Sequence, residues 1–471
     1  MRIALIVALA SATSLLGCGG GDSEGTAGSS SGSSSTGSSA STSGAAGQNQ
    51  PPSWDAAPKM PLELGQGKTL SIPIAPVDPE GDMVTVALDT SALAAGVEAA
   101  DPTGGTAILT HADYAAMGTA HFGVNLDDGH GGKASATVDL DVRPIRWLGS
   151  TSWKDGEGPE AREHGAFIVD AEHGRAFLVY GSGYKPYLNP LKDVWRFDFA
   201  SSTWTEITPT GDLPTPGGSH RVAQIPGQQV AYLYGGYGAN GTANHDLFRA
   251  TYTGDGVVFK KITQTSPQPQ ARDLHMFVYD AKNDRFFAFG GVGSAPLNDT
   301  WMMKLQGDAA TWTKLTMATS PTPRYGFFYG VDQDDGRALV WSGAQGTATI
   351  NPAGDAWALD MRSEPPAWHL LLDAKAPGAP PGRRNGAAIF DPTGPRLFVY
   401  GGTADAMTTE PGFFALDARP GKEAWAEVDR TSAPPLRSSC FGFYDAVKDQ
   451  RVLGFGNTAS GVFRDLWTLG Y

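Results

Sequence analysis

The sequence is poor in charged residues, and most of those it has are acidic. Only 18% of its 471 residues are Asp, Glu, Lys or Arg, while 41% are hydrophobic. This balance excludes a chain that is disordered throughout and predicts a sizeable core. The 35 basic residues are outnumbered by 49 acidic ones, which gives a net charge of −14. That charge argues against nucleic acid or an anionic membrane surface as a binding partner.

The chain has an excess of residues that interrupt helices. It contains 61 glycines and 33 prolines, well above their usual share, so long helices are not expected. A turn-rich sequence with a hydrophobic core predicts an all-β protein. The length allows two to four domains, or fewer where one of them is a barrel or a propeller.

The first 17 residues predict a secretion signal. Met1-Arg2 precedes an apolar run, Ile3 to Leu16, that is too short for an ordinary transmembrane helix. Leu15-Leu16-Gly17-Cys18 resembles the lipobox of bacterial lipoproteins, which implies that Cys18 is lipidated and becomes the first residue of the mature chain. The residue after it is Gly19 rather than Asp, which implies an outer-membrane lipoprotein facing the periplasm or the cell surface. The alternative is an ordinary cleaved signal in which Cys18 is incidental.

Residues 18–52 predict a flexible tether, because Ser, Gly, Thr and Ala dominate them and offer little with which to build a core. If Cys18 is lipidated, Cys440 is the only other cysteine, so no intramolecular disulfide is available. Stability in an oxidising compartment must then come from sheet packing.

Residues 53–143 alternate polar and apolar side chains in short runs, which predicts a small β-sandwich. Two acidic turns, at 78–82 and 127–132, each precede a strand. With those strands they resemble cadherin-like and immunoglobulin-like domains of bacterial surface proteins.

Acidic turns of this kind suggest a calcium site, since Ca²⁺ takes six to eight oxygen ligands that flexible acidic loops supply. The candidate ligands are Asp78, Glu80, Asp82, Asp127 and Asp128. The alternative is that Asp and Gly simply suit tight turns. No other cofactor is expected.

A repeat of 52 to 59 residues fills the C-terminal part, 144–471. An apolar strand ends in an aromatic residue followed by Gly or Ser six times, at 180–181, 234–235, 289–290, 341–342, 400–401 and 455–456. A second aromatic follows each time, and in five repeats an Asp stands two residues before it. Four short strands per repeat with these marks resemble kelch repeats, which implies a six-bladed β-propeller.

The sixth repeat stops one strand short at Tyr471. The missing strand is predicted at 145–150, where Ile145-Arg146-Trp147-Leu148 looks like a fourth strand. Pairing of this segment with the last repeat would close the ring and leave no free sheet edge.

Aligning the repeats at the Gly pairs places arginines at the start of the first strand in five of them. They are Arg162, Arg272, Arg324, Arg383 and Arg437, and Gly218 takes this place in the second repeat. The kelch resemblance implies that this position lies near the mouth of the central channel, where a partial ring of guanidinium groups would suit a carboxylate ligand. The alternative is that each arginine pairs with a repeat carboxylate and holds the sheets together.

The same alignment places His164 and His220 in one slot of adjacent repeats and His275 one residue out of register. Two ligands fall short of a transition-metal site, so structural histidines are the simpler interpretation. His164 and His220 are also candidates, with the five arginines, for binding a ligand at the channel mouth. Cys440 is expected to be a buried free thiol.

No catalytic motif is recognised, so the chain is not expected to be an enzyme. Copper oxidases resembling galactose oxidase need Tyr and His ligands and a Cys cross-linked to Tyr, but here only Cys440 is available and no matching His motif is recognisable. The stretch at 307–312 is the nearest to a sialidase motif, but it lacks the Ser and the central Gly of that motif.

The predicted function is that of a lipid-anchored cell-envelope protein whose propeller binds a glycan or a protein. Long inserts at 183–190, 237–245 and 344–354 are the expected recognition loops. A carbohydrate-active propeller enzyme, either mutarotase- or epimerase-like or oxidase-like, is the first alternative. A structural scaffold without a dedicated ligand is the second.

Overall fold

The computed structural model describes residues 48–93, 96–100, 106–111, 118–183, 189–254, 256–347, 349–405, 408–428 and 431–471. The predicted signal peptide, Cys18 and the tether up to residue 47 lie outside these ranges. Within them all elements are strands except one helical turn, η1 (Ala171–His173). The predicted all-β class is therefore confirmed. Among these described residues no helix is long and apolar enough to cross a membrane.

Two sheets between residues 62 and 143 enclose one hydrophobic core. The first has the order β1 (Leu62–Gly65), β7 (Lys133–Arg143), β6 (Gly118–Asp127) and β3 (Thr85–Asp89). The second has the order β2 (Thr69–Pro73), β5 (Thr106–His111) and β4 (Val97–Ala100). Alternation along β6 buries Phe122 and Val124 fully and leaves His121 exposed, as expected where one sheet face meets the core.

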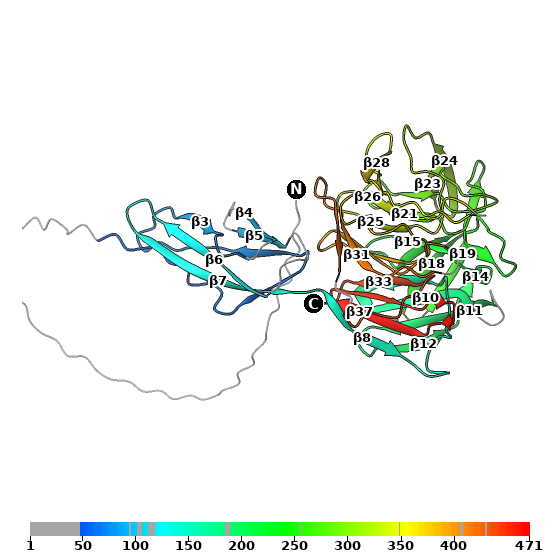
Figure 1. The fold of residues 1–471 in the computed structure, drawn as a ribbon, viewed down its shortest axis with the longest axis horizontal. Helices are drawn as coiled ribbons and strands as arrows, with labels where there is room; N and C mark the ends of the chain where they lie inside the picture. Colours follow the sequence, from blue (N-terminus) through cyan, green and yellow to red (C-terminus); the bar gives the residue numbers. More distant parts are fainter. Residues whose placement is uncertain are drawn as a thin grey trace, which may run out of the picture. The chain divides into compact units, whose positions relative to one another are not determined.

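Six antiparallel sheets of four principal strands lie between Arg146 and Gly470 in the described residues (Figure 1). Sheet one contains β9 (Ala166–Asp170), β10 (Arg175–Gly183), β11 (Asn189–Asp198) and β12 (Thr203–Ile207). Sheet two contains β15 (Arg221–Gln224), β16 (Val230–Tyr234), β18 (Leu247–Thr253) and β19 (Gly256–Lys261), with the short β13 (Thr210–Gly211) at its outer edge. Sheet three contains β21 (Met276–Asp280), β22 (Arg285–Phe289), β23 (Thr300–Gln306) and β24 (Ala309–Leu315), with β20 (Thr263–Thr265) at its outer edge.

The remaining three sheets follow the same plan. Sheet four contains β25 (Phe328–Asp332), β26 (Arg337–Trp341), β27 (Ala356–Asp360) and β28 (Ala367–Leu372). Sheet five contains β29 (Ala387–Asp391), β30 (Arg396–Tyr400), β31 (Phe413–Asp417) and β32 (Ala424–Glu427). Sheet six contains β33 (Phe441–Asp445), β34 (Gln450–Gly454), β37 (Asp465–Gly470) and β8 (Arg146–Ser152). Two short pairs, β14 (Gly217–Gly218) with β17 (Tyr237–Gly238) and β35 (Asn457–Thr458) with β36 (Gly461–Val462), lie in the connecting loops.

Each sheet packs on both of its neighbours through a separate apolar cluster, and the six clusters form a closed cycle. Between sheets one and two, for example, Phe177 and Phe259 belong to the same buried cluster. The cycle closes between sheets six and one, where the rings of Phe167 and Phe443 lie 4.8 Å apart between centroids. The six sheets therefore form a β-propeller, with their first strands around the centre.

The last sheet combines strands from the two ends of the propeller sequence. β37 pairs antiparallel with β8, with Trp467 opposite Ser150 and Leu469 opposite Trp147 (Figure 1, where red β37 runs beside teal β8). This is the pairing that the repeat pattern predicts for 145–150. Trp147 is 6% exposed, and its ring lies 5.3 Å from Phe413 and 6.2 Å from Trp467 between centroids.

Replacing Trp147 by Ala should destabilise the propeller by about 3–5 kcal/mol, because it empties the aromatic cluster between sheets five and six. Urea unfolding of the full chain, followed by tryptophan fluorescence, measures the change. Leu148→Ala is the matched control, since Leu148 lies in the same strand and is 42% exposed. Equal unfolding midpoints for the two variants would contradict a closing role of β8.

Candidate functional site

In four of the six sheets a buried arginine binds the aspartate of the repeated Asp-x-Trp motif. The pairs are Arg162–Asp193, Arg272–Asp299, Arg324–Asp355 and Arg437–Asp465. Each guanidinium donates two N–H groups to its carboxylate at 2.5–3.1 Å and a further bond to the backbone carbonyl 18 residues later at 3.0–3.1 Å. All four arginines are 0% exposed. These bidentate pairs tie the start of the first strand to the loop before the third.

The tryptophan of the motif completes this unit. The indole N–H groups of Trp195, Trp301, Trp357 and Trp467 donate to the same carboxylates at 2.5–2.8 Å. Burial by itself would raise the pKa of Asp193, Asp299 and Asp355, but the hydrogen bonds and charge of the paired arginines outweigh it and hold each pKa below its ordinary value.

Sheet five has a different arrangement, because Gly412 stands where the other motifs have Asp. Arg383 donates instead to the backbone carbonyls of Glu410 and Pro411 at 3.3 and 3.1 Å. Its burial lowers the pKa of the guanidinium to about 10, against the opposing charge of Glu410.

The structure therefore contradicts the prediction that these arginines form a ligand-binding ring at the channel mouth. These five side chains are buried and bound to protein groups, and they do not face an opening. The second sheet also needs a correction of register. The bridge between Gly218 and Tyr237 matches that between Glu163 and Ser182 in sheet one, so Gly217, and not Gly218, takes the place of the arginine. A Cβ on Gly217 would lie 1.8 Å from the Tyr237 carbonyl oxygen, so no side chain fits there.

Two positions after the arginine, every sheet has a residue in the left-handed backbone region. These six residues are His164, Ser219, Leu274, Gly326, Asn385 and Ser439, with φ between 52° and 64°. Backbone N–H groups link five of the six neighbouring pairs at 2.5–3.3 Å. The remaining link is replaced, since the N–H of Leu274 bonds the Asp273 carboxylate at 2.7 Å. We call these six residues the central ring.

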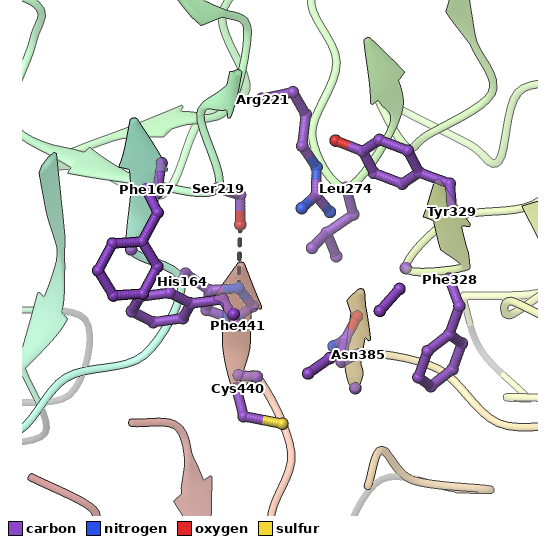
Figure 2. Close-up of a pocket in the computed structure, with 18 of the residues that line it drawn as sticks. His164, Phe167, Ser219, Arg221, Leu274, Phe328, Tyr329, Asn385, Cys440 and Phe441 are labelled. Atoms are coloured by element: carbon purple, nitrogen blue, oxygen red, sulfur yellow. Dashed lines mark hydrogen bonds between the residues drawn. The ribbon is translucent and has the colours of Figure 1, made fainter. Parts of the chain in front are cut away.

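Two cavities border the central ring. One, of about 220 Å³, is lined by the inner strands and includes Arg221, Tyr329 and Cys440 (Figure 2). The other, of about 300 Å³, is lined by Glu163, Asp273 and Arg384. Four ring residues line both, so the ring narrows the space between them. We call the first cavity the channel and the second the mouth.

The mouth contains two carboxyl groups in an unusual environment. Burial raises the pKa of Glu163 to about 7. Burial also raises the pKa of Asp273 to about 6, against the nearby charge of Arg221 and the hydrogen bond from Leu274. Asn457 donates a hydrogen bond to Glu163. Both carboxyls therefore exchange protons near neutral pH, which is the range in which acid–base or pH-dependent binding groups operate.

His164 lies on the central ring between charged neighbours. Its Nδ1 is 3.0 Å from the Ser219 hydroxyl (Figure 2). Burial, with the charges of Arg221 and Arg384, lowers its pKa to about 3. The imidazole is therefore neutral at physiological pH.

The other two histidines belong to a different slot from the one the sequence suggests. The corrected register aligns His220 with His275, one position after the central ring, and it aligns His164 with Ser219. Nδ1 of His220 lies 2.8 Å from the Gly235 carbonyl, and the buried ring of His275 packs against the edge of Tyr234. Within the described residues no group of three or more His, Cys, Asp or Glu side chains could hold a metal ion.

Cys440 shares the slot of His220 and His275 and is a buried free thiol. Burial raises its pKa to about 11, with Arg437 opposing. A neutral thiol of this kind is a poor nucleophile.

The acidic turns of the sandwich do not gather into a calcium site. Asp78 and Asp128 accept backbone N–H bonds within their own turns, Glu80 accepts from Gln50, and Asp127 pairs with Lys133 at 2.9 Å. Asp82 lies 3.2 Å from the His130 ring nitrogen. Within the described residues these carboxylates form no group of three that could hold a metal ion, and their contacts are those expected of tight turns.

Arg221, Asp273 and Arg384 are site residues that the repeat pattern alone does not predict. Asp273 and Arg384 directly follow the repeated arginine, as Glu163 does. In this position each sheet has a different residue, namely Glu163, Gly218, Asp273, Tyr325, Arg384 and Ser438. A variable position beside one that is arginine in five of the six sheets is the signal that identifies the mouth.

One family model and several known proteins match the repeats of this chain in sequence. A family model described as the KLHDC2/KLHL20/DRC7 Kelch-repeats domain matches residues 219–457. Adagio protein 3 of Arabidopsis thaliana is 24% identical over 323 residues, which are 65% of this chain and 51% of that protein. Serine/threonine-protein phosphatase BSL2 of Arabidopsis thaliana is 28% identical over 211 residues, 45% of this chain and 20% of that protein. The chain thus spans about half the length of these relatives or less.

Among solved structures, that of YjhT is similar with a TM-score of 0.45 and 14% sequence identity. The match covers 67% of this chain and 96% of that one.

Replacing Asp355 by Asn should lower the free energy of unfolding by about 3–5 kcal/mol, because it removes the countercharge of fully buried Arg324. The depressed pKa of Asp355 means that the difference from wild type is full above the ordinary aspartate pKa and shrinks as the pH falls below about 4. Urea unfolding at several pH values measures it. Asp155→Asn, which removes an exposed ion pair with Arg464, should leave the midpoint unchanged. A difference that grows in acid would contradict the pairing argument.

Proposed function

Because the chain belongs to the KLHDC2/KLHL20/DRC7 Kelch-repeats domain family, we propose that its propeller is a binding module that takes its partner at the mouth. The observation that carries this proposal is the contrast between neighbouring positions. The repeated Arg–Asp–Trp units are buried scaffold, whereas the residue after each arginine differs from sheet to sheet, and four of these residues, Glu163, Asp273, Arg384 and Ser438, line an open polar cavity. Variable polar groups on a rigid repeated frame are typical of binding sites.

Loops on the same face support this placement. Tyr237, Gly241, Thr403 and Asn457 line the mouth, and all of them follow the second strand of their sheets. Two of the predicted inserts, 237–245 and 344–354, are loops of this kind, and the first supplies Tyr237 and Gly241. The third insert, 183–190, falls largely outside the described residues.

The proposed partner is a protein or a glycan of the cell envelope or its surroundings. The proposed setting is the outer membrane, with the chain anchored through a lipid on Cys18 and a cadherin-like sandwich at 53–143 between the tether and the propeller. The lipobox-like sequence and the Ser- and Gly-rich tether support this setting.

A second candidate function is carbohydrate-active catalysis at the mouth, of the mutarotase or epimerase kind. It is favoured by Glu163 and Asp273, whose raised pKa values of about 7 and about 6 are suited to general acid–base catalysis. An assay for conversion of any sugar that binds separates the two functions, since turnover would contradict a role in binding alone.

Blocking the mouth should weaken partner binding. Asn240→Trp adds a bulky ring beside Gly241 at the mouth and should weaken binding at least about tenfold by steric exclusion. Asn283→Trp, in the exposed turn between β21 and β22 at the opposite ends of the strands, is the matched control. A glycan array and crosslinking in envelope fractions, both with the full chain, identify the partner, and titration gives its affinity. Equal affinities for both variants would contradict binding at the mouth.

The membrane anchor is tested separately. Wild-type protein expressed with a clickable palmitate analogue should incorporate the label and partition into detergent on phase separation, because an acyl chain adds apolar area. Cys18→Ser should remain unlabelled and partition into water. A wild-type chain that carries no label would exclude lipidation at Cys18.

A further inference from the structure

The turn between β1 and β2 of the sandwich, Gly65 to Lys68, lies against the propeller, and we call it the docking turn. The N–H of Lys68 donates to the Gly65 carbonyl at 3.0 Å, and Gly67 has the left-handed conformation with a φ of 72°. Gln66 and Lys68 are only 4% and 8% exposed. Such side chains are normally solvated at the tip of a turn, so their burial means that another part of the chain covers them.

Gln66 connects the docking turn to both ends of the propeller sequence. Its side-chain carbonyl oxygen accepts the N–H of Ile145 at 2.9 Å, and its backbone carbonyl oxygen accepts the Tyr471 hydroxyl at 2.6 Å. Ile145 is fully buried in the apolar cluster between sheets five and six. Only Pro144, whose φ is fixed by its ring, separates Ile145 from Arg143 at the end of β7. The sandwich is therefore attached to the propeller at two places, the covalent linker and the docking turn.

Lys68 extends from the docking turn into the junction between sheets five and six. Its Nζ lies 3.0 Å from a carboxylate oxygen of Asp391 and 2.8 Å from one of Asp449, and it also donates to the Thr393 hydroxyl. The ring centroid of Tyr471 lies 5.6 Å from the same Nζ. A buried ammonium group is stable only where partners of this kind replace water. The propeller therefore supplies a socket for this one side chain.

The socket depends on an exception in sheet five. In sheets one and three the aspartate that ends the first strand pairs with the arginine that begins the second. These pairs are Asp170–Arg175 and Asp280–Arg285. In sheet five Arg396 instead pairs with Asp417 at 2.8 Å. The Asp391 carboxylate is thereby left to bind Lys68 and, from sheet six, Arg451.

The backbones of the two parts also approach closely. A Cβ on Gly394, in the turn between β29 and β30, would lie 2.1 Å from the Gly67 carbonyl oxygen. The three atoms nearest to that Cβ all belong to Gly67 and Lys68. On the other side of the contact, a Cβ on Gly65 would lie 2.6 Å from the Tyr471 ring. Glycine at these two positions therefore makes room for the docked turn.

The docking turn lies on the face of the propeller opposite the mouth. The mouth residues Arg384 and Thr403 precede the first strand and follow the second strand of sheet five. Asp391 and Gly394 lie at the other ends of these two strands, and Asp449 lies in the corresponding turn of sheet six. The docked sandwich therefore leaves the mouth uncovered.

We propose that the sandwich and the propeller move as one rigid unit, in which the docking turn keeps the mouth on the face turned away from the sandwich. Domains joined by a linker and a small interface normally move relative to one another. Here a short proline linker, a buried ion pair and a close backbone contact act together against rotation at Pro144. The inference goes beyond the proposed binding role of the mouth and does not depend on it. Any partner at the mouth would approach from the side away from the sandwich.

Distances between two spin labels, measured by pulsed electron paramagnetic resonance on the full chain, test the proposal. The labels are attached at Thr137→Cys in β7 and Lys282→Cys in the turn after β21, both exposed positions. Cys18→Ser removes the competing thiol, and Cys440 is buried. We expect a single narrow distance distribution. Gly394→Ala should broaden it, because the added methyl group displaces the docking turn.

Gly256→Ala is the matched control and should keep the narrow distribution. Gly256 lies in a turn on the same face, in sheet two, and the nearest atom to its Cβ would be the Thr253 carbonyl oxygen at 4.0 Å. Lys68→Met removes the charge but keeps the length of the side chain, and it should also broaden the distribution if Gly394→Ala does not fold. A broad distribution in the wild type would overturn the proposal, as would equal distributions in Lys68→Met, Gly394→Ala and Gly256→Ala.

Discussion

A four-stranded sheet with two apolar faces cannot be stable alone, and this constraint determines the C-terminal part of the chain. Each of the six sheets buries one face on the preceding sheet and the other on the next, through clusters rich in Phe, Tyr and Trp. The cycle is complete only because β8 and β37, which are separated by more than 300 residues of sequence, pair within one sheet. Closure thus stabilises every sheet at once, and it brings the six first strands around a common centre.

Polar units, each made of a buried arginine, its aspartate and a tryptophan, organise the centre of the propeller. Arg272 and Asp299, with Trp301, show the arrangement that recurs in three other sheets: a buried cation, its carboxylate and an indole N–H. Each unit fixes where the first strand begins, so the residues that follow it are presented at equivalent places around the channel. The scaffold therefore repeats, and the residues at the mouth are free to differ.

Much of this plan could be predicted from the sequence, because the aromatic, Gly and Asp marks recur with the period of the sheets. The register could not, since it depends on backbone conformation. Tyr180 and Phe455 adopt the left-handed conformation that Gly235 and Gly290 adopt in other sheets, so aligning by residue type shifts the repeats by one position. The same limit explains why alignment by residue type puts Gly218 in the arginine slot and predicts the arginines at an opening. Spacing shows that a residue recurs, but not whether a carboxylate 27 to 31 residues away covers it.

The break in the central ring lies at the buried carboxyl of Asp273, within the electrostatic reach of Arg221. Between sheets two and three, Asp273 rather than a neighbouring backbone carbonyl receives the N–H of Leu274, and the charge of Arg221 acts on the same carboxyl group. Holding an unpaired guanidinium and a desolvated carboxyl inside a propeller lowers its stability. Elsewhere the chain supplies an aspartate for almost every buried arginine, so its composition does not explain the exception. Asp273 has two roles at this junction, since it accepts the N–H of Leu274 and lies within the electrostatic reach of Arg221.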